Sequence, residues 1–320
     1  ERVLVAQERI NYNTVYTFKQ KVTNKYLFMT EIRSMDMKYG NSSLIQIKIL
    51  NNNNIYISLP YIKDDIPIGI LLIAYGFTKE DINKNIKKKY AYNIINQVKD
   101  YDRQEAYDEI INNSIQIIPS ENKDEFIDSL LYKDILPHLN NFNKDDRTKY
   151  LKYILYMIKL LIKTVEKEIE PNDRDHISNK RCETAGILVG DLFRSLWKKL
   201  LKNLQILLTK RQDIMLMLNR TNTISQGIKQ CFSTGNWSIF KNTYVRTGVS
   251  QILNRLSYSG TLSHLKRLVI PVGKEGKNTK IRQIHSSQFG YICPTETPEG
   301  QSAGVVKNFC LLTAVSHYID

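Results

Sequence analysis

Apolar and polar residues alternate with a period of two between Leu44 and Leu59, on both sides of the polar run from Asn51 to Asn54. The apolar positions are Ile45, Ile47, Ile49, Ile55, Ile57 and Leu59. Successive side chains of a β-strand point to opposite faces of a sheet, so this alternation is typical of strands with one buried face. Two such runs joined by a short polar segment predict a β-hairpin.

Near Leu151 the period of the apolar positions changes from two to that of an α-helix. Lysines occupy a different face, and Asp145 or Asp146 is the candidate N-cap residue. The pattern predicts an amphipathic helix with the apolar residues Leu151, Ile154, Leu155, Ile158, Leu161, Ile162 and Val165 and the lysines Lys149, Lys152, Lys159 and Lys163.

A second amphipathic helix is predicted from Ile187 to about Leu208. Its inward side chains are expected to be Leu188, Leu192, Phe193, Leu196, Leu200, Leu204 and Leu207, and its outward ones Lys198, Lys199, Lys202 and Lys210. The lysines either form a solvated polar face, which we favour, or follow phosphate groups.

A polar segment from Glu170 to His176 separates the two predicted helices and contains the helix-breaking Pro171. We interpret it as a boundary. From about Thr234 onward Gly, Ser and Thr become frequent, which predicts short elements joined by loops.

The composition is that of a folded protein. The 320 residues suffice for about two domains of roughly 100 to 200 residues each. With 42% hydrophobic and 24% charged residues, wholesale disorder and collagen-like or coiled-coil architectures are excluded. The chain opens on Glu1 rather than Met and stops at Asp320 directly after an apolar segment, so we expect a piece of a longer protein.

The net charge of the chain indicates what kind of partner it binds. The 46 Lys and Arg against 32 Asp and Glu leave a net charge of +14. A protein this basic is expected to meet a polyanion, either nucleic acid or an anionic membrane surface. The longest mostly apolar stretch, Ile66 to Phe77, is shorter than the roughly 20 residues of a membrane helix, so no membrane span is predicted. Four widely spaced cysteines argue against a zinc ribbon and a disulfide-rich secreted scaffold, and favour reduced thiols in an intracellular protein.

Basic residues are concentrated between Arg255 and Gln283, where seven Lys or Arg accompany the single acid Glu275 for a local net charge of +6. Within it, the glycine-containing segment from Pro271 to Asn278 resembles a flexible basic hairpin tip. A phosphate-contacting loop and an ordinary soluble turn are both compatible with its spacing. The Gly-x4-Gly-Lys-Ser/Thr spacing of a Walker A loop is absent.

Neither histidines nor carboxylates in the final third have the spacing of a metal site. His264 and His285 are isolated from other ligand types, so we interpret both as structural. Glu296 and Glu299 lie in a turn that Pro294 and Pro298 make rigid. Because no dense carboxylate cluster occurs there, the chain is expected to lack its own catalytic metal site.

Several motifs together resemble one family. The segment from Cys293 to Gln301, followed by Gly304 to Asn308, is similar to the "CPxETPEGQ…GLVKN" signature of the second-largest subunit of multisubunit DNA-directed RNA polymerases. Further similar segments occur in the family's order along nearly the whole chain. They are residues 5–9, 59–67, 173–176, 235–237, 248–255, 261–267 and 282–285. The likeness is strongest to the eukaryotic RNA polymerase II type and fainter to the bacterial β subunit.

This resemblance implies an α+β, multi-domain fold in which a mixed α/β lobe is inserted in a protrusion domain and followed by a loop-rich fork. Residues 1–16 would end the first protrusion segment, 17–186 would form the lobe, 187–245 would return to the protrusion, and 246–320 would form the fork with its ETPEG motif. Two fork loops are implied, one at about 234–242 near the RNA–DNA hybrid and one at about 271–279 near downstream strand separation.

The implied function is a contribution to the DNA cleft and active-centre wall of a DNA-directed RNA polymerase, a nucleotidyltransferase that works as a multisubunit transcription complex. The implied partners are the largest and other polymerase subunits, the DNA template, the RNA–DNA hybrid and nucleoside triphosphates, and no membrane. Mg²⁺ would be bound by the largest subunit and not by this chain, which alone is expected to be inactive. The implied location is intracellular, in the nucleus for a cellular enzyme and in host cytoplasm or virion for a viral one.

The resemblance also assigns site residues. Arg282, Glu299 and Gln301 are expected close to the active centre, with Arg282 near the incoming nucleotide and Glu299 in an electrostatic and positioning role, its carboxylate held in a nearly fixed direction. No catalytic residue and no metal ligand is expected in the chain itself. The candidate nucleic-acid-binding residues are Arg255, Lys266, Arg267, Lys274, Lys277 and Lys280.

One alternative of another class stays open, a detached basic nucleic-acid-binding module with no polymerase role. Sequence beyond Asp320 would separate the two hypotheses, because only the polymerase subunit predicts a long polymerase-like extension. The first half is rich in Asn, Lys, Ile and Tyr, which is typical of an AT-rich genome. Together with drift from the family pattern in the lobe, this bias favours a large DNA virus as the source.

Overall fold

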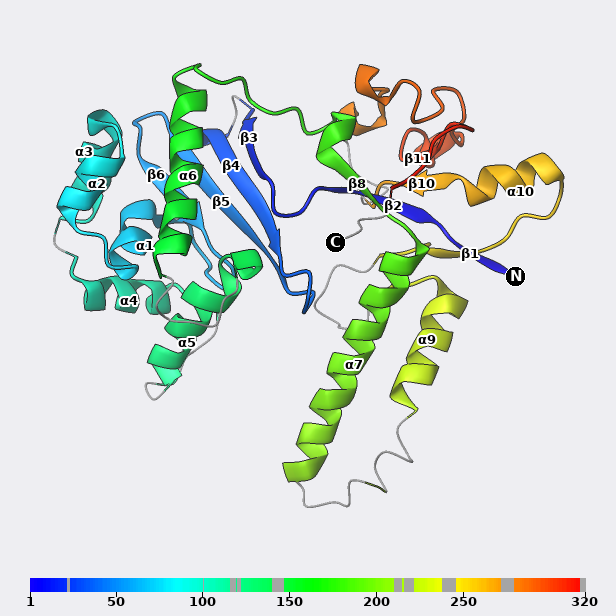
Figure 1. Ribbon diagram of the computed structural model, residues 1–320, viewed down its shortest axis with the longest axis horizontal. Coiled ribbons are helices and arrows are strands. Elements are labelled where there is room, and N and C mark those ends of the chain that lie inside the picture. The colour runs from blue at the N-terminus through cyan, green and yellow to red at the C-terminus, as the bar shows by residue number, and fades with distance from the viewer. Residues whose placement is uncertain are drawn as a thin grey trace. The chain divides into compact units, whose positions relative to one another are not determined.

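The computed structural model describes residues 1–21, 24–99, 101–115, 119, 122–139, 147–209, 215, 222–237, 246–271 and 279–316. They form two compact units. We call residues 11–174 the insert unit, and residues 1–10 together with 175–320 the host unit, because the insert unit interrupts the chain of the host unit (Figure 1).

An antiparallel five-stranded sheet forms the framework of the insert unit. Its strands, in spatial order, are β3 (Val15–Lys19), β4 (Tyr26–Met35), β5 (Ser42–Leu50), β6 (Ile55–Ser58) and β7 (Ile66–Pro67). Ile47 pairs with Ile57 and Ile49 with Ile55, so the predicted hairpin is confirmed. The five isoleucines of its alternating pattern are at most 1% exposed. Asn53 takes a positive φ of 63° in the connecting turn, a conformation that Asn tolerates better than most residues.

Helices share one hydrophobic core with the isoleucine-lined face of this sheet. They are α1 (Ile68–Ala74), α2 (Lys79–Asn85), α3 (Lys88–Gln97), α4 (Arg103–Asn112), α5 (Lys123–Ser129) and α6 (Arg147–Val165), with a π-helical turn at Leu130–Asp134 and a 3-10 turn at Pro137–Leu139. The helix α6 lies against β3, β4 and β5 (Figure 1). Its predicted apolar face is confirmed, since every member is buried except the half-buried Val165. The predicted cap, Asp145 or Asp146, lies outside the described residues.

The apolar stretch from Ile66 to Phe77 belongs to this core, because α1 is buried along its whole length. None of the helices in the described parts of the chain is long and apolar enough to cross a membrane.

A four-stranded sheet of order β11-β10-β2-β8 forms the centre of the host unit. Its strands are β2 (Ala6–Ile10), β8 (Lys180–Glu183), β10 (Arg267–Val269) and β11 (Val306–Asn308), and a separate pair joins β1 (Arg2–Leu4) to β9 (Ser250–Ile252). The helices are α7 (Ala185–Thr209), α9 (Thr223–Thr234) and α10 (Tyr258–Leu265), with 3-10 turns at Ile177–Asn179, Lys280–Arg282, Ser286–Gln288 and Gly300–Ser302. The predicted α+β class, with short elements toward the C-terminal end, is confirmed.

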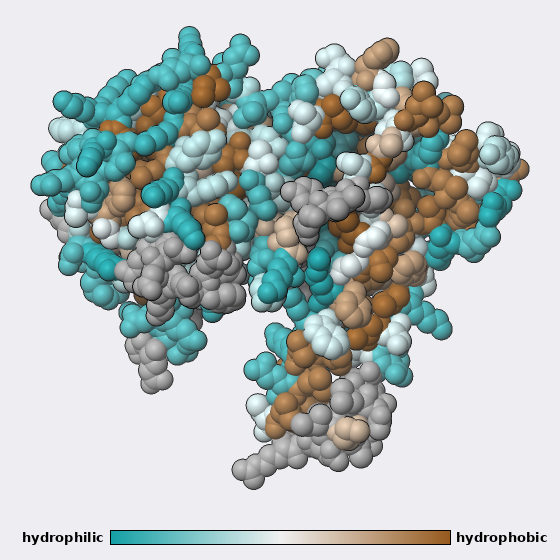
Figure 2. Space-filling view, viewed as in Figure 1, coloured by the Kyte–Doolittle hydropathy of each residue, from teal (hydrophilic) through white to brown (hydrophobic). Residues whose placement is uncertain are grey.

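The packing of α7 against α9 corrects one prediction. The stripe Leu188, Leu192, Leu196 and Leu200 is buried as expected. Phe193, expected to point inward, is 46% exposed and stacks on Trp197 instead. Within the described residues α9 covers one stripe of α7, and Phe193 lies about 100° around the helix from Leu192. Apolar side chains therefore gather on the surface along α7 (Figure 2).

Truncation of a sheet isoleucine tests the insert-unit core. Ile47 is fully buried, so Ile47→Ala should lower the free energy of unfolding by about 2–5 kcal/mol through lost burial and a residual cavity. Denaturant titration followed by far-UV circular dichroism would measure it. Leu44→Ala, at a residue of the same strand that is 38% exposed, is the control and should cost much less. Equal effects of the two variants would contradict the assignment of this face.

Candidate functional site

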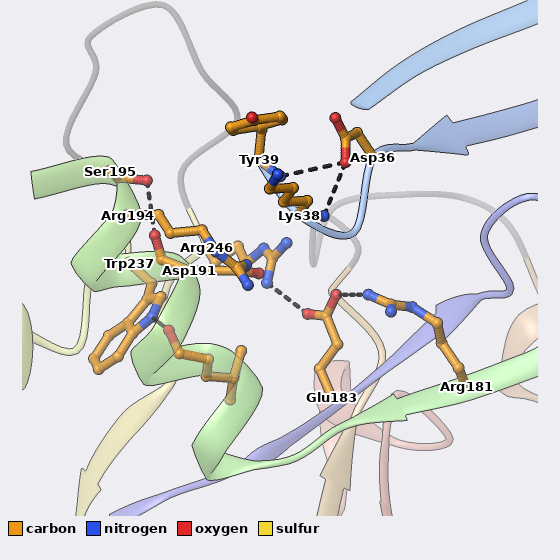
Figure 3. Close-up of polar contacts among 11 residues, drawn as sticks. Asp36, Lys38, Tyr39, Arg181, Glu183, Asp191, Arg194, Ser195, Trp237 and Arg246 are labelled. Carbon is orange, nitrogen blue, oxygen red and sulfur yellow. Dashed lines mark hydrogen bonds and ion pairs between the residues drawn. The ribbon is translucent and has the colours of Figure 1, made fainter. Parts of the chain in front are cut away.

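The base of the candidate site is a sheet with a buried carboxylate on each face. In the register of β2 and β8, Gln7 lies opposite Glu183 and Glu8 opposite Cys182, so the side chains of Glu8 and Glu183 point to opposite faces. Glu183 is fully buried. Its Oε1 accepts from Arg181 Nη2, and its Oε2 accepts from Arg246 Nη1 at 2.6 Å (Figure 3). Two guanidinium groups therefore compensate the buried charge.

This ion cluster also anchors the segment that precedes β9. The backbone N–H of Trp237 donates to the carbonyl of Arg246 at 2.8 Å, and its indole Nε1–H donates to the carbonyl of Leu188 on α7 at 2.8 Å (Figure 3). Burial and the neighbouring Glu183 raise the pKa of Asp191, although Arg194 pairs with it at 2.8 Å.

On the other face, Glu8 pairs with two lysines. Its Oε1 lies 3.3 Å from Lys180 Nζ and its Oε2 lies 3.7 Å from Lys307 Nζ. Lys307 is a buried residue of β11 and also lines the cavity described below. The central strand β2 therefore fixes a cation at the edge of the candidate site.

The segment from Cys293 to Gln301 is tied down at several points along its backbone. Ile292 forms a bridge with Phe309, and the N–H of Cys293 donates to the carbonyl of Asn308 at 2.8 Å. Glu296 Oε1 accepts from the hydroxyl of Ser263 on α10. Gly300 takes a φ of +76°, which confirms the turn expected there.

Arg282 meets this segment from the opposite side. Its Nη1 donates to the carbonyl oxygen of Gln301 at 2.6 Å and to that of Ala303 at 2.9 Å. Two of the three residues assigned to the active centre are thus brought together, Arg282 through its guanidinium and Gln301 through its backbone.

A cavity of about 220 Å³ lies between these elements. Among its lining residues are Arg282, Cys293, Glu296, Thr297, Gly304 and Lys307. Hydrogen bonds from the Thr295 hydroxyl and from the backbone N–H groups of Thr295 and Glu296 lower the pKa of the Cys293 thiol. The walls therefore combine cations, a carboxylate and an acidified thiol with apolar side chains.

The nearly fixed direction expected for the carboxylate of Glu299 stays a prediction. Glu299 directly precedes the turn Gly300–Ser302, and its side chain is exposed. Within the described part of the chain, no hydrogen bond or ion pair holds its carboxylate. The turn fixes the backbone but not the side chain, because the prolines restrict φ only. The side chain of Gln301 is likewise exposed.

Of the four candidate nucleic-acid-binding cations that the structure describes, three have a polar partner within the protein. Arg255 Nε donates to Glu1 at 2.7 Å, Lys266 Nζ donates to the carbonyl of Phe309 at 3.1 Å, and Lys280 lies 3.4 Å from Asp175. Arg267 is half-buried in β10, opposite Asn308. Lys274 and Lys277, with the predicted hairpin tip, lie outside the described residues.

Both histidines of this region have structural roles. The buried His264 accepts from the backbone N–H of Asn254 at Nδ1, at 3.1 Å, and donates from Nε2 to Gln251 at 2.9 Å. His285 caps the turn Ser286–Gln288 by accepting from the N–H of Ser287. Among the residues that the structure describes, no group of three or more His, Cys, Asp or Glu could hold a metal ion.

Sequence reasoning missed three residues of this site, Glu183, Thr297 and Gly304. Thr297 and Gly304 were part of the quoted signature but received no role. The partners of Glu183 are an arginine two residues away and one 63 residues away, so only the folded chain reveals that cluster.

Comparison with known proteins assigns the chain to a class, the second-largest subunits of RNA polymerases. A family model described as RNA polymerase Rpb2, domain 2, matches residues 11–183, and one described as RNA polymerase Rpb2, domain 3, matches residues 251–315. The first match covers more than half of the chain. The chain belongs to the RNA polymerase Rpb2 family, and the resemblance inferred from the motifs is confirmed.

Relatives from three kinds of source are similar to the chain. It is 36% identical over 99% of its length to "DNA-directed RNA polymerase II subunit 2" of Arabidopsis thaliana and covers 29% of that protein. It is 33% identical over 99% of its length to a "probable DNA-directed RNA polymerase II subunit RPB2 homolog" of Invertebrate iridescent virus 6, covering 30% of it. The archaeal "DNA-directed RNA polymerase subunit Rpo2N" of Methanothermobacter thermautotrophicus is 30% identical over 82% of the chain, which covers 56% of it. The chain thus spans less than a third of the length of the plant and viral relatives.

The environment of His264 predicts how host-unit stability depends on pH. Burial and the nearby Arg267 lower the pKa of His264 below its ordinary value of 6.5. The unfolded chain therefore binds the proton more tightly, and this contribution to stability is present above about pH 6.5 and is lost as the pH falls through 6.5 toward the folded pKa.

Both tryptophans, Trp197 and Trp237, lie in the host unit, so tryptophan fluorescence reports its unfolding selectively. The fluorescence-detected free energy of unfolding should fall between about pH 7 and pH 5. His264→Gln, which removes the titrating group, should flatten that slope. An unchanged slope in the variant would contradict the assignment.

Proposed function

We propose that the chain is a part of the second-largest subunit of a DNA-directed RNA polymerase and contributes to the DNA cleft and active-centre wall during template-directed RNA synthesis. The observation that carries the proposal is the match to two Rpb2 domains in sequence order. It is supported by the turn at 293–301 and the residues after it, because the carbonyls of Gln301 and Ala303 accept hydrogen bonds from the Arg282 guanidinium beside a 220 Å³ cavity.

In this proposal residues 1–16 and 187–245 belong to a protrusion, 17–186 to a lobe and 246–320 to a fork. The partners are the largest and other polymerase subunits, the DNA template, the RNA–DNA hybrid and nucleoside triphosphates. Mg²⁺ would be bound by the largest subunit, where it would stabilise the charge that develops during nucleotidyl transfer. The location would be intracellular, the nucleus for a cellular enzyme and host cytoplasm or virion for a viral one.

The proposed contribution of this chain is to position charged groups. Arg282 would contact the incoming nucleotide, Glu299 would bias the basic groups around it, and Gln301 would lie close to both. Arg255, Lys266, Arg267, Lys274, Lys277 and Lys280 would neutralise phosphates without reading sequence. Because Arg255 and Lys280 are paired with carboxylates, each would have to exchange its partner for a phosphate.

Reconstitution tests the proposal. The full-length subunit that contains this sequence, combined with its largest-subunit partner and Mg²⁺, should extend an RNA primer on a DNA template, and the 320-residue chain alone should not. Nucleic-acid binding without any contribution to RNA synthesis would favour the alternative, a detached basic binding module.

Arg282→Lys in the assembled polymerase should raise the apparent KM for nucleotides by about tenfold. A lysine keeps the charge, but its single ammonium cannot serve two backbone carbonyls and a phosphate with a guanidinium's fixed geometry. Steady-state primer extension over a nucleotide titration would measure the effect. The control is Arg194→Lys, at an exposed residue of α7, which should leave KM unchanged. An unaltered KM in Arg282→Lys would reduce Arg282 to a structural role.

Glu299→Gln should change the elongation rate or the misincorporation frequency by about twofold or more, with assembly intact. The substitution keeps the shape of an exposed side chain and removes its charge, so the effect should shrink as salt rises. Single-turnover nucleotide addition at two ionic strengths would measure it. Kinetics identical to the parent at low salt would contradict the electrostatic role.

A further inference from the structure

The side-chain hydroxyl of Thr297, in the turn at 293–301, hydrogen-bonds to the backbone of the residues that follow this turn. Thr297 Oγ1 donates to the carbonyl of Val306 at 2.9 Å and accepts from the N–H of Gly304 at 2.9 Å. One O–H group is thus used both as donor and as acceptor. The backbone at Gly304 and at Val306 is thereby tied to the side chain of Thr297.

Gly304 lies so close to Arg282 that no side chain fits there. A Cβ at this position would lie 2.6 Å from the Cα of Arg282 and closer still to its carbonyl oxygen. The φ of Gly304 is also +71°, which glycine adopts without strain. The backbones of Gly304 and Arg282 are therefore in direct contact, at a place that the hydroxyl of Thr297 fixes.

The same loop also fixes the other end of Arg282. The carbonyls of Gln301 and Ala303, both inside the segment that Thr297 closes, accept from the Arg282 guanidinium at 2.6 and 2.9 Å. Main chain and side chain of Arg282 are thus fitted to one loop. A shift of that loop would move the guanidinium with it.

We propose that Thr297 and Gly304 are positioning residues that set the Arg282 guanidinium for the incoming nucleotide, and that they act on nucleotide binding only through Arg282. The inference rests on the proposed function, because it needs Arg282 to contact the nucleotide. It adds two residues whose observed hydrogen bonds are to the protein's own backbone and to each other.

The first test is a matched pair at Thr297 in the assembled polymerase. Thr297→Val keeps the shape and removes the hydroxyl, and should raise the apparent KM for nucleotides at least fivefold with a smaller change in kcat. Thr297→Ser restores the hydroxyl and should return KM to within twofold of the parent. Equal KM values for the valine and serine variants would overturn the proposal.

Glycine variants separate the close contact from backbone strain. Gly304→Ala should raise KM, whereas Gly290→Ala, at a φ of +84° but with open space around its Cβ, should lower stability without raising KM. If Gly304→Ala prevents assembly, the pair at Thr297 decides the question alone. A KM increase of equal size in both glycine variants would assign the effect to strain and overturn the role of Gly304.

A double variant identifies the route of the effect. When Arg282→Lys has already raised KM, adding Thr297→Val should raise it less than twofold further, because the residue through which Thr297 acts is no longer an arginine. Full multiplication of the two effects would overturn the inference and leave the proposed function standing. An unchanged KM in Arg282→Lys itself would overturn the role of Arg282 and this inference together.

Discussion

The antiparallel pairing of β2 with β8 is the constraint on which the host unit depends. The two strands are the chain segments on either side of the insert unit, and Ile10 lies directly opposite Lys180. β2 is an inner strand, with β8 on one side and β10 on the other. β10 also pairs with β11, the strand that follows the turn at 293–301. The position of β11 therefore depends on β2 being part of the sheet.

The pairing of β2 with β8 buries two carboxylates, which require cationic partners. Glu183 and Glu8 face opposite sides of the sheet. Glu183 is compensated by Arg181 of its own strand and by Arg246, and Glu8 by Lys180 of β8 and Lys307 of β11. A carboxylate removed from water is tolerated only with such partners, and loss of one partner leaves an uncompensated charge. The sheet therefore couples the fit of β2 and β8 to the placement of Arg246 and Lys307, and so to the edge of the cavity.

Local patterns predicted the elements well and their partners poorly. The alternation at Ile45 to Leu59 and the stripe at Leu151 to Val165 reveal buried faces, because period alone determines which side chains share a face. Phe193 was misplaced because the width of the buried stripe depends on how many neighbours α7 has, which its own sequence does not encode. Arg282 was located by motif, yet its carbonyl partners depend on a chain reversal that brings residues about 20 positions apart together.

The residues in and around the turn at 293–301 divide into those that fix its backbone and those that expose their side chains. Ser263, Thr297 and Gly304 each hydrogen-bond to another part of the chain, and these interactions fix the backbone, although Thr297 itself is exposed. Glu299 and Gln301 turn their side chains to solvent on that fixed backbone. Backbone carbonyls that hold a guanidinium are permanent dipoles and need little reorganisation when a charged ligand arrives, which is the condition under which electrostatic groups contribute most to a reaction. If other subunits complete the site, as proposed, a rigid backbone that presents exposed side chains suits it better than a closed pocket would.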